Sequence, residues 1–183
     1  MDQTAQESRQ YQPLHVVVMG VSGTRKSSVA ALLAERLGVD FVEGDDLHPA
    51  SNKAKMAAGT PLTDEDRWPW LERILERMRA ESAQGHGLVV TCSALKRAYR
   101  QILSQDDGAR TVFAHLTGPR ELIAARLNSR QGHFFPKHLL DSQFQVLEPL
   151  GTDEYGFDVK IDEAVEQEVH EILRALPRFA ETR

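Results

Sequence analysis

One stretch near the start of the chain constrains the fold more than any other. Residues 16–33 read VVVMGVSGTRKSSVAALL: an apolar run, a short glycine-containing segment and a pattern typical of a helix. The phosphate-binding pattern GxxxxGK[ST] is met at Gly20, Lys26 and Ser27, but Arg25 stands where the pattern has glycine. A strand before the loop and an amphipathic helix after it are the setting that this motif requires. The stretch therefore predicts a phosphate-binding loop with one altered residue.

In such a loop, backbone N–H groups and the helix dipole together attract phosphate oxygens. Lys26 is expected at the β- and γ-phosphates of ATP, and the Ser27 hydroxyl is expected to bind Mg²⁺. At positive φ, Arg25 would carry strain of about 1–2 kcal/mol, partly offset if its side chain brings a second cation to the phosphates. A simple βα turn is the alternative. The residues expected to bind the nucleotide here are Gly20, Ser22, Gly23, Thr24, Arg25, Lys26, Ser27 and Ser28.

Short apolar runs alternate with helical patterns along the chain, which predicts a parallel α/β sheet. Strands are expected at 15–19, up to about 43, at 87–92, at 111–116 and at 158–161. Helices are expected after the first strand, over 50–58, from Trp70 onward and after 162, where Asp162 can cap the last helix. Pro69 predicts a loop or broken turn over 59–69.

Composition narrows the class of protein. The 183 residues are 41% hydrophobic and 27% charged, with a net charge of -5, which fits one globular domain and weighs against a nucleic-acid partner. Cys92 is the single cysteine, so the chain has no intramolecular disulfide, and a reducing compartment is expected. No apolar run has transmembrane length. We expect a cytoplasmic protein without a membrane partner, with a polar tail over 1–13 and a single domain over 14–183.

A second informative stretch, FVEGDDLHPASNKAKMAAGTPLTDEDRWPWL, covers residues 41–71. It places Glu43 and Asp45 at the carboxyl end of a predicted strand, where open α/β sheets bind their ligands. Beside a triphosphate, one carboxylate can hold a water on Mg²⁺ while the other orients or deprotonates a hydroxyl. Acidic residues in this position are often only turn formers, so the pattern alone leaves both interpretations open.

Together with TCSALKRAYR at 91–100 and SRQGHFFPKHLLDSQFQVLEPL at 129–150, this stretch resembles the gluconokinase family of small P-loop kinases. The family is similar in fold to shikimate and adenylate kinases, and the resemblance runs from His15 to Ile161. It implies a five-stranded parallel sheet flanked by helices, a substrate-binding segment at about 45–80 and a mobile lid at about 130–140. It also implies a homodimer that uses ATP and Mg²⁺ to phosphorylate the 6-hydroxyl of D-gluconate.

The resemblance assigns roles to residues of these motifs. Asp45 becomes the candidate base, and Glu43 joins Ser27 as a candidate magnesium ligand. Gluconate carries a carboxylate and a row of hydroxyls, so its site needs a cation and hydrogen-bonding groups. Taken by themselves, the cationic residues would be interpreted as solvated, and Trp70 as part of the core. The residues expected to bind gluconate are Asp45, His48, Asn52, Lys55, Arg67, Lys96, Arg100 and His133.

Two arginines four residues apart, Arg126 and Arg130, are expected on one helix face. In similar kinases the first lies over the adenine and the second reaches phosphate oxygens during transfer, so Arg130 joins Lys26 and Asp45 as a candidate catalytic residue. His133 in the GHFFP motif closes over the substrate or belongs to a packed lid, and both interpretations remain open.

Other classes of protein are weighed against this interpretation. A GTPase needs an NKxD segment, and SNKAK at 51–55 lacks the aspartate. A kinase for shikimate, a nucleotide or another small alcohol would share the fold and the phosphate chemistry. A noncatalytic nucleotide-binding or interaction protein, or a nucleotide-binding protein with weakened catalysis, is the third alternative, because of Arg25. The strand at 87–92 has no acidic residue at its end, which is consistent with the resemblance, because in this group of kinases the carboxylates after the second strand take over that role.

Overall fold

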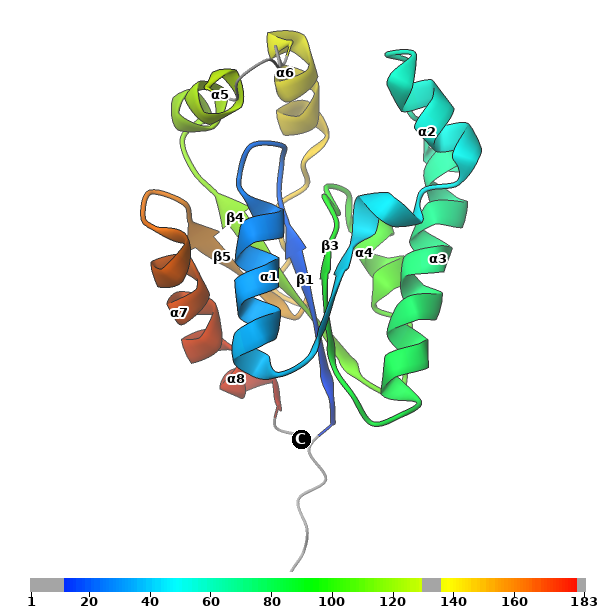
Figure 1. Cartoon of the computed structure of the whole chain (residues 1–183), viewed down its shortest axis with the longest axis vertical. Helices are drawn as coiled ribbons and strands as arrows, with labels where there is room; N and C mark the ends of the chain where they lie inside the picture. Colours follow the sequence, from blue (N-terminus) through cyan, green and yellow to red (C-terminus); the bar gives the residue numbers. More distant parts are fainter. Residues whose placement is uncertain (1–11, 130–135, 181–183) are drawn as a thin grey trace, which may run out of the picture.

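A computed structural model describes residues 12–129 and 136–180 and shows helices on both sides of a central sheet (Figure 1). The five strands of this sheet are all parallel, in the spatial order β2-β3-β1-β4-β5. This confirms the predicted fold class. The strands are β1 (Leu14–Met19), β2 (Asp40–Glu43), β3 (Leu88–Thr91), β4 (Arg110–Thr117) and β5 (Gly156–Lys160).

Each face of the sheet has its own hydrophobic core, because successive side chains of a strand point to opposite faces. Val16 and Val18 of β1 belong to one core, whereas Val17 and Met19 belong to the other. The first core is closed by α1 (Lys26–Leu37), α5 (Arg120–Asn128), α6 (Lys137–Val146), α7 (Val165–Ala175) and α8 (Pro177–Ala180). The second is closed by α3 (Asp64–Ser82) and α4 (Arg97–Leu103).

The carboxyl ends of the central strands lie at one edge of the sheet. β1 leads into the loop 20–25, β2 leads into the 3₁₀ helix η1 (Gly44–Leu47), and β3 ends at Thr91. The strand register pairs Glu43 and Val18 with Thr91, so the three strand ends lie at the same level. From η1 the chain continues into α2 (Ala50–Ala57), which lies beyond this edge (Figure 1). The loops that carry the predicted site therefore meet at one end of the molecule.

The loop predicted over 59–69 is wrong from Asp64 onward, because α3 begins there and contains Pro69. A capping box starts the helix: Thr63 Oγ1 accepts from the Asp66 N–H, and the Asp66 carboxylate accepts from the Thr63 N–H. Pro69 is exposed and lacks one N–H near the helix start, while the apolar stripe beginning at Trp70 is buried. Capping and burial outweigh the lost hydrogen bond.

The last helix also begins differently from the prediction. Its N-cap is Ala164, which makes no side-chain cap, so Asp162 does not cap α7. Asp162 lies too far before Val165 to accept from the first free N–H groups of the helix. Val169, Ile172 and Leu176 are buried and attach this end of the chain to the core.

Candidate active site

The loop between β1 and α1 has a backbone that glycine favours. Gly20 and Gly23 have φ of +143° and +86°. A Cβ on Gly20 would lie 2.7 Å from Leu116 O, and one on Gly23 would lie 2.7 Å from Leu127 Cγ. Arg25 has φ 64° and ψ 36°, so the condition under which the altered residue would carry strain is met. The loop thus has positive φ at residues 20, 23 and 25, and the altered residue adopts the backbone region that glycine favours.

Lys26 and Ser27 begin α1 directly after this loop. Lys26 Nζ donates to the Val21 carbonyl at 3.0 Å, so the ammonium group lies over the loop itself. Thr24 is fully buried and its hydroxyl also donates to Val21 O, at 3.0 Å, which holds the turn closed. Ser28 lies exposed on the first turn of α1. A cation therefore stands where a bound phosphate would need one.

Glu43 connects three neighbouring strand ends. Its two carboxylate oxygens accept hydrogen bonds from the hydroxyls of Ser27 and Thr91. Thr91 Oγ1 also accepts from the Gly44 N–H at 3.1 Å, which fixes the start of η1. A Cβ on Gly44 would lie 1.9 Å from Thr91 O, so the chain needs glycine here. Sequence reasoning missed Thr91, although a polar residue at the carboxyl end of a buried strand is a usable signal.

The oxygen atoms of Ser27 and Glu43 fit the ligand preference of Mg²⁺, which takes one or two protein oxygens together with phosphates and waters. Within residues 12–129 and 136–180, no group of three or more His, Cys, Asp and Glu side chains could hold a metal ion by itself. These two residues could hold Mg²⁺ together with nucleotide phosphates.

Asp45 lies on η1 with a side chain that is 80% exposed, at the edge of the sheet beside Glu43. Partial desolvation by neighbouring groups raises the pKa of Asp45. The negative charge of Glu43 raises this pKa further, whereas the positive charge of Lys26 lowers it. Because the carboxylate is open to solvent here, further loss of hydration would come from a ligand that covers it. Such a carboxylate is suited to accept a proton from a bound hydroxyl.

His48 and Asn52 lie behind η1 and are buried. The His48 ring stacks on Trp70 at 4.0 Å, and Trp70 Nε1 donates to the Gly44 carbonyl at 2.8 Å. Asn52 Nδ2 lies 3.2 Å from His48 Nδ1 and donates to the Asp66 carbonyl at 2.8 Å. The prediction that Trp70 belongs to the core is confirmed. His48 and Asn52 thus hold η1 against α3.

Burial lowers the pKa of His48 to about 4, and the positive charges of Arg67 and Lys53 act in the same direction. His48 is therefore neutral at pH 7. Its Nε2 lies 3.9 Å from Asp45 Oδ1, so a neutral imidazole and not a cation borders the candidate base.

The predicted cations of the substrate segment gather at the start of α3. Lys55 pairs with Asp66 at 2.7 Å and Lys96 pairs with Asp64 at 3.1 Å, while Arg67 lies 3.9 Å from Asp64. Three positive charges thus face two negative ones, and each of the three side chains is 31% to 41% exposed. We name Lys55, Arg67 and Lys96 the cationic cluster. Its excess positive charge is suited to a carboxylate ligand.

Arg100 is a correction to the predicted substrate-binding set. It is 1% exposed, and the five N–H groups of its guanidinium are all in hydrogen bonds within the protein. Two donate to the carboxylate of Glu154, and the others donate to the carbonyls of Ala94, Leu95 and Pro149. No donor remains for a substrate, so Arg100 holds α4 to the segment around 149–154.

Two arginines of the predicted nucleotide site reach the connection between β5 and α7. Arg126 Nη2 donates to Ile161 O at 2.5 Å. Arg25 Nη2 donates to Glu163 O at 2.8 Å and to Glu168 Oε1 at 3.2 Å. The guanidinium of Arg25 is thus directed to α7, which corrects the expectation that it serves as a second phosphate cation. Arg130 and His133 lie outside the described residues, as do residues 130–135 of the lid predicted at about 130–140.

The helices on either side of residues 130–135 both contact the phosphate loop. Leu127 of α5 packs against Gly23, and Gln143 of α6 accepts from the Ser22 N–H at 2.7 Å and donates to its hydroxyl at 2.9 Å. Sequence reasoning missed Gln143, because nothing local marks an amide 121 residues from its partner.

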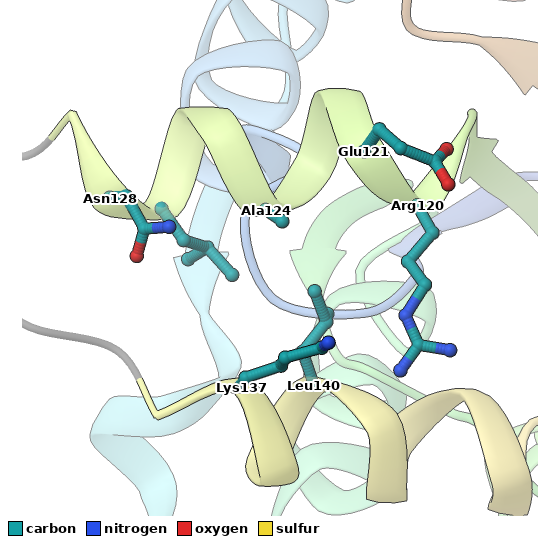
Figure 2. Close-up of a pocket in the computed structure, with 7 residues that line it drawn as sticks. Arg120, Glu121, Ala124, Asn128, Lys137 and Leu140 are labelled. Atoms are coloured by element: carbon teal, nitrogen blue, oxygen red, sulfur yellow. The ribbon is translucent and has the colours of Figure 1, made fainter.

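A cavity of about 270 Å³ separates α5 from α6, as Figure 2 shows. None of the predicted site residues lines it. The chemistry is therefore assigned to the strand ends and not to this cavity. Its lining residues are Arg120, Glu121, Ala124, Leu127, Asn128, Lys137 and Leu140.

Comparison with known proteins agrees with this geometry. The AAA domain family model matches residues 16–150. The gluconokinase of Gluconobacter oxydans is 47% identical, over 88% of this chain and 90% of that protein. A probable gluconokinase of Xenopus tropicalis is 43% identical, over 86% and 90%. The chain belongs to the gluconokinase family.

Solved structures agree with this result. A gluconokinase from Sinorhizobium meliloti has a TM-score of 0.84 and 42% identity, over 93% of this chain and 95% of that one. At 17% identity, a shikimate kinase from Aquifex aeolicus has a TM-score of 0.59 and covers 91% of this chain and 98% of its own, so it shares the fold alone.

We expect Arg100→Ala to destabilise the protein by about 3–5 kcal/mol, because it removes the buried cation 2.7 Å from the largely buried Glu154 carboxylate and leaves, among the described residues, only the Gly151 N–H and Arg97, at 3.8 Å, beside it. The free energy of unfolding in urea measures this loss. Arg97→Ala is the control, since Arg97 pairs mainly with Asp153 at a largely exposed position and lies 3.8 Å from Glu154, so its loss should cost far less. A stable Arg100→Ala protein with a greatly increased KM for the acceptor would restore Arg100 to the substrate site.

Proposed function

We propose that this protein is an ATP-dependent gluconokinase that transfers the γ-phosphoryl group of ATP to the 6-hydroxyl of D-gluconate. The arrangement that carries this proposal is the meeting of the phosphate loop, Asp45 and the cationic cluster at one edge of the sheet. Membership of the gluconokinase family supports the choice of gluconate among small alcohols.

ATP binds with its phosphates on the N–H groups of the loop and with Lys26 beside the β- and γ-phosphates. Arg126 lies toward the adenine, and Arg130 reaches the phosphate oxygens. Mg²⁺ bound with Ser27 and Glu43 would neutralise part of the phosphate charge. This chain's own residues then act mainly by positioning, as is general for phosphoryl transfer.

Gluconate binds with its carboxylate toward the cationic cluster and its 6-hydroxyl toward Asp45, and His133 either contacts it or belongs to a packed lid. The 6-oxygen attacks the γ-phosphorus while the bond from that phosphorus to the β-phosphate oxygen breaks, and ADP leaves. The hydroxyl proton passes to the Asp45 carboxylate. His48 and Asn52 hold η1, and hence Asp45, in place.

We further infer a cytoplasmic homodimer whose single domain over 14–183 has its substrate segment at about 45–80 and its lid at about 130–140. The family resemblance supports the dimer and the lid. Burial raises the pKa of Cys92, the only thiol, to about 12, so this cysteine is unreactive, as suits a reducing compartment. Among the described helices, none is both long and apolar enough to cross a membrane.

A coupled assay with Mg-ATP across gluconate, shikimate and nucleoside monophosphates tests the substrate. We expect gluconate to give the highest kcat/KM. A higher value for any other acceptor would overturn the assignment, and ATP binding without turnover of any of them would favour the noncatalytic alternative.

Asp45→Asn should lower kcat by roughly 10² or more, because the amide cannot accept the proton, while ATP affinity changes little. The wild-type kcat/KM should fall as the pH decreases, since Asp45 must be ionised. Because the pKa of Asp45 is raised, this acid limb should lie above the ordinary value of 3.8. A variant with normal turnover would remove Asp45 from the mechanism.

Lys26→Ala should raise the KM for ATP by at least tenfold whichever acceptor is used, because the ammonium group neutralises part of the negative charge of the phosphates. Initial rates at varied ATP concentration measure this effect. Arg36→Ala, an exposed position at the other end of the same helix, is the matched control and should leave the KM unchanged. An unaltered KM for Lys26→Ala would show that the loop does not bind phosphate in this way.

A further inference from the structure

The residue that departs from the phosphate-loop pattern has its own binding partners far along the chain. Arg25 Nη2 contacts Glu163 O and Glu168 Oε1, which are 138 and 143 residues away. Arg25 is bonded directly to Lys26 and is the N-cap of α1. Figure 1 shows α7 alongside α1, with the β5–α7 connection at the same end of the sheet as the loop. The Arg25 side chain therefore ties the phosphate loop to α7.

Glu168 is buried in a way that requires a partner. Its side chain is 1% exposed, and burial raises its pKa, against which the charges of Arg25 and Arg126 act. A carboxylate removed from water is costly unless a cation and hydrogen bonds compensate for it. Because α7 carries Glu168 on its first turn, the pair also fixes where that helix begins.

The group formed by Arg25, Arg126 and Glu168 differs from the saturated Arg100 site. Arg25 Nε, Arg126 Nη1 and Glu168 Oε2 are all buried, and they have no hydrogen-bond partner among the described residues. Both arginines also donate to carbonyls of the connection 161–164, at Ile161 and Glu163. The group thus holds this connection from two sides, from the phosphate loop and from α5.

A non-glycine residue stays in the left-handed conformation only where its surroundings determine it strongly. At Arg25 those surroundings include the contacts of its guanidinium with Glu163 and Glu168. We propose that Glu168 is a positioning residue for nucleotide binding. By holding the Arg25 guanidinium against the connection 161–164, it keeps residue 25 left-handed and the loop N–H groups directed at the phosphates. The inference rests on the proposed function in that ATP is the ligand.

The test is a double-mutant cycle on ATP binding. Calorimetric titration with Mg-ATP, without acceptor, compares the wild type, Glu168→Gln, Arg25→Gly and the double variant. Glu168→Gln should weaken ATP binding by roughly three- to tenfold, which lies in the lower part of the range found for contacting residues. In the Arg25→Gly background the same change should have less than a twofold effect, because the side chain that Glu168 holds is gone. Glu166→Gln, an exposed position on the same turn of α7, makes the same charge change and should leave ATP affinity unaltered.

Two results would overturn the proposal. One is a Glu168→Gln protein that binds ATP like the wild type. The other is a loss of affinity that persists in the Arg25→Gly background, which would show a purely structural role. Should Glu168→Gln fail to fold, Arg25→Lys replaces it, because lysine keeps the charge but cannot reach both partners; unaltered ATP binding there is equally decisive. If the wild type binds ATP but does not phosphorylate gluconate, the proposed acceptor is wrong. The conclusion from the double-mutant cycle on ATP binding is then unaffected.

Discussion

The carboxylate of Glu43 is the contact on which the geometry of the site depends. It accepts hydroxyl donors from Ser27, after β1, and from Thr91, at the end of β3. Because β3 lies between β2 and β1 in the sheet, one carboxylate fixes three neighbouring strand ends. The same negative charge acts on Asp45, two residues later. Glu43 therefore both fixes the positions of the strand ends and raises the pKa of Asp45 at this edge of the sheet.

The arginines of the molecule show how a structural cation differs from one available for binding. Arg100 is buried with every N–H group hydrogen-bonded to the protein, so a ligand could reach it only by breaking those bonds. Arg67 is 31% exposed and lies with Lys96 against the Tyr99 ring, at 5.6 Å and 5.7 Å. The sequence motifs assign both Arg100 and Arg67 to substrate binding. Only their hydrogen-bond partners in the structure show that the two arginines differ in availability.

What the sequence could predict was mainly local. Apolar runs and glycine positions predicted the sheet and the phosphate loop, because strand burial and loop conformation depend on neighbouring residues. The predicted loop over 59–69 is wrong from Asp64 onward because the capping box at Thr63 and Asp66 starts a helix that continues through Pro69. The prediction that Asp162 caps the last helix is wrong because a residue that is able to cap need not lie at the N-cap, which is Ala164 here.

The contacts that escaped prediction join distant parts of the chain. Glu154 lies 54 residues from Arg100, and Thr91 lies 48 residues from Glu43. No local periodicity marks such pairs. They depend on the strand order and on which helix packs against which strand, and a single sequence does not state either.

At Arg25, a local sequence motif and contacts with distant residues both determine the structure. The phosphate-loop pattern asks for glycine because glycine adopts positive φ without strain, but what the loop needs is the conformation and not the residue. Here φ is 64°, and Lys26 and Ser27 follow in their usual places. The local rule is broken at one residue, and contacts with Glu163 and Glu168 compensate from the far end of the chain. A motif of this kind is therefore better judged by the backbone that it forms than by its letters.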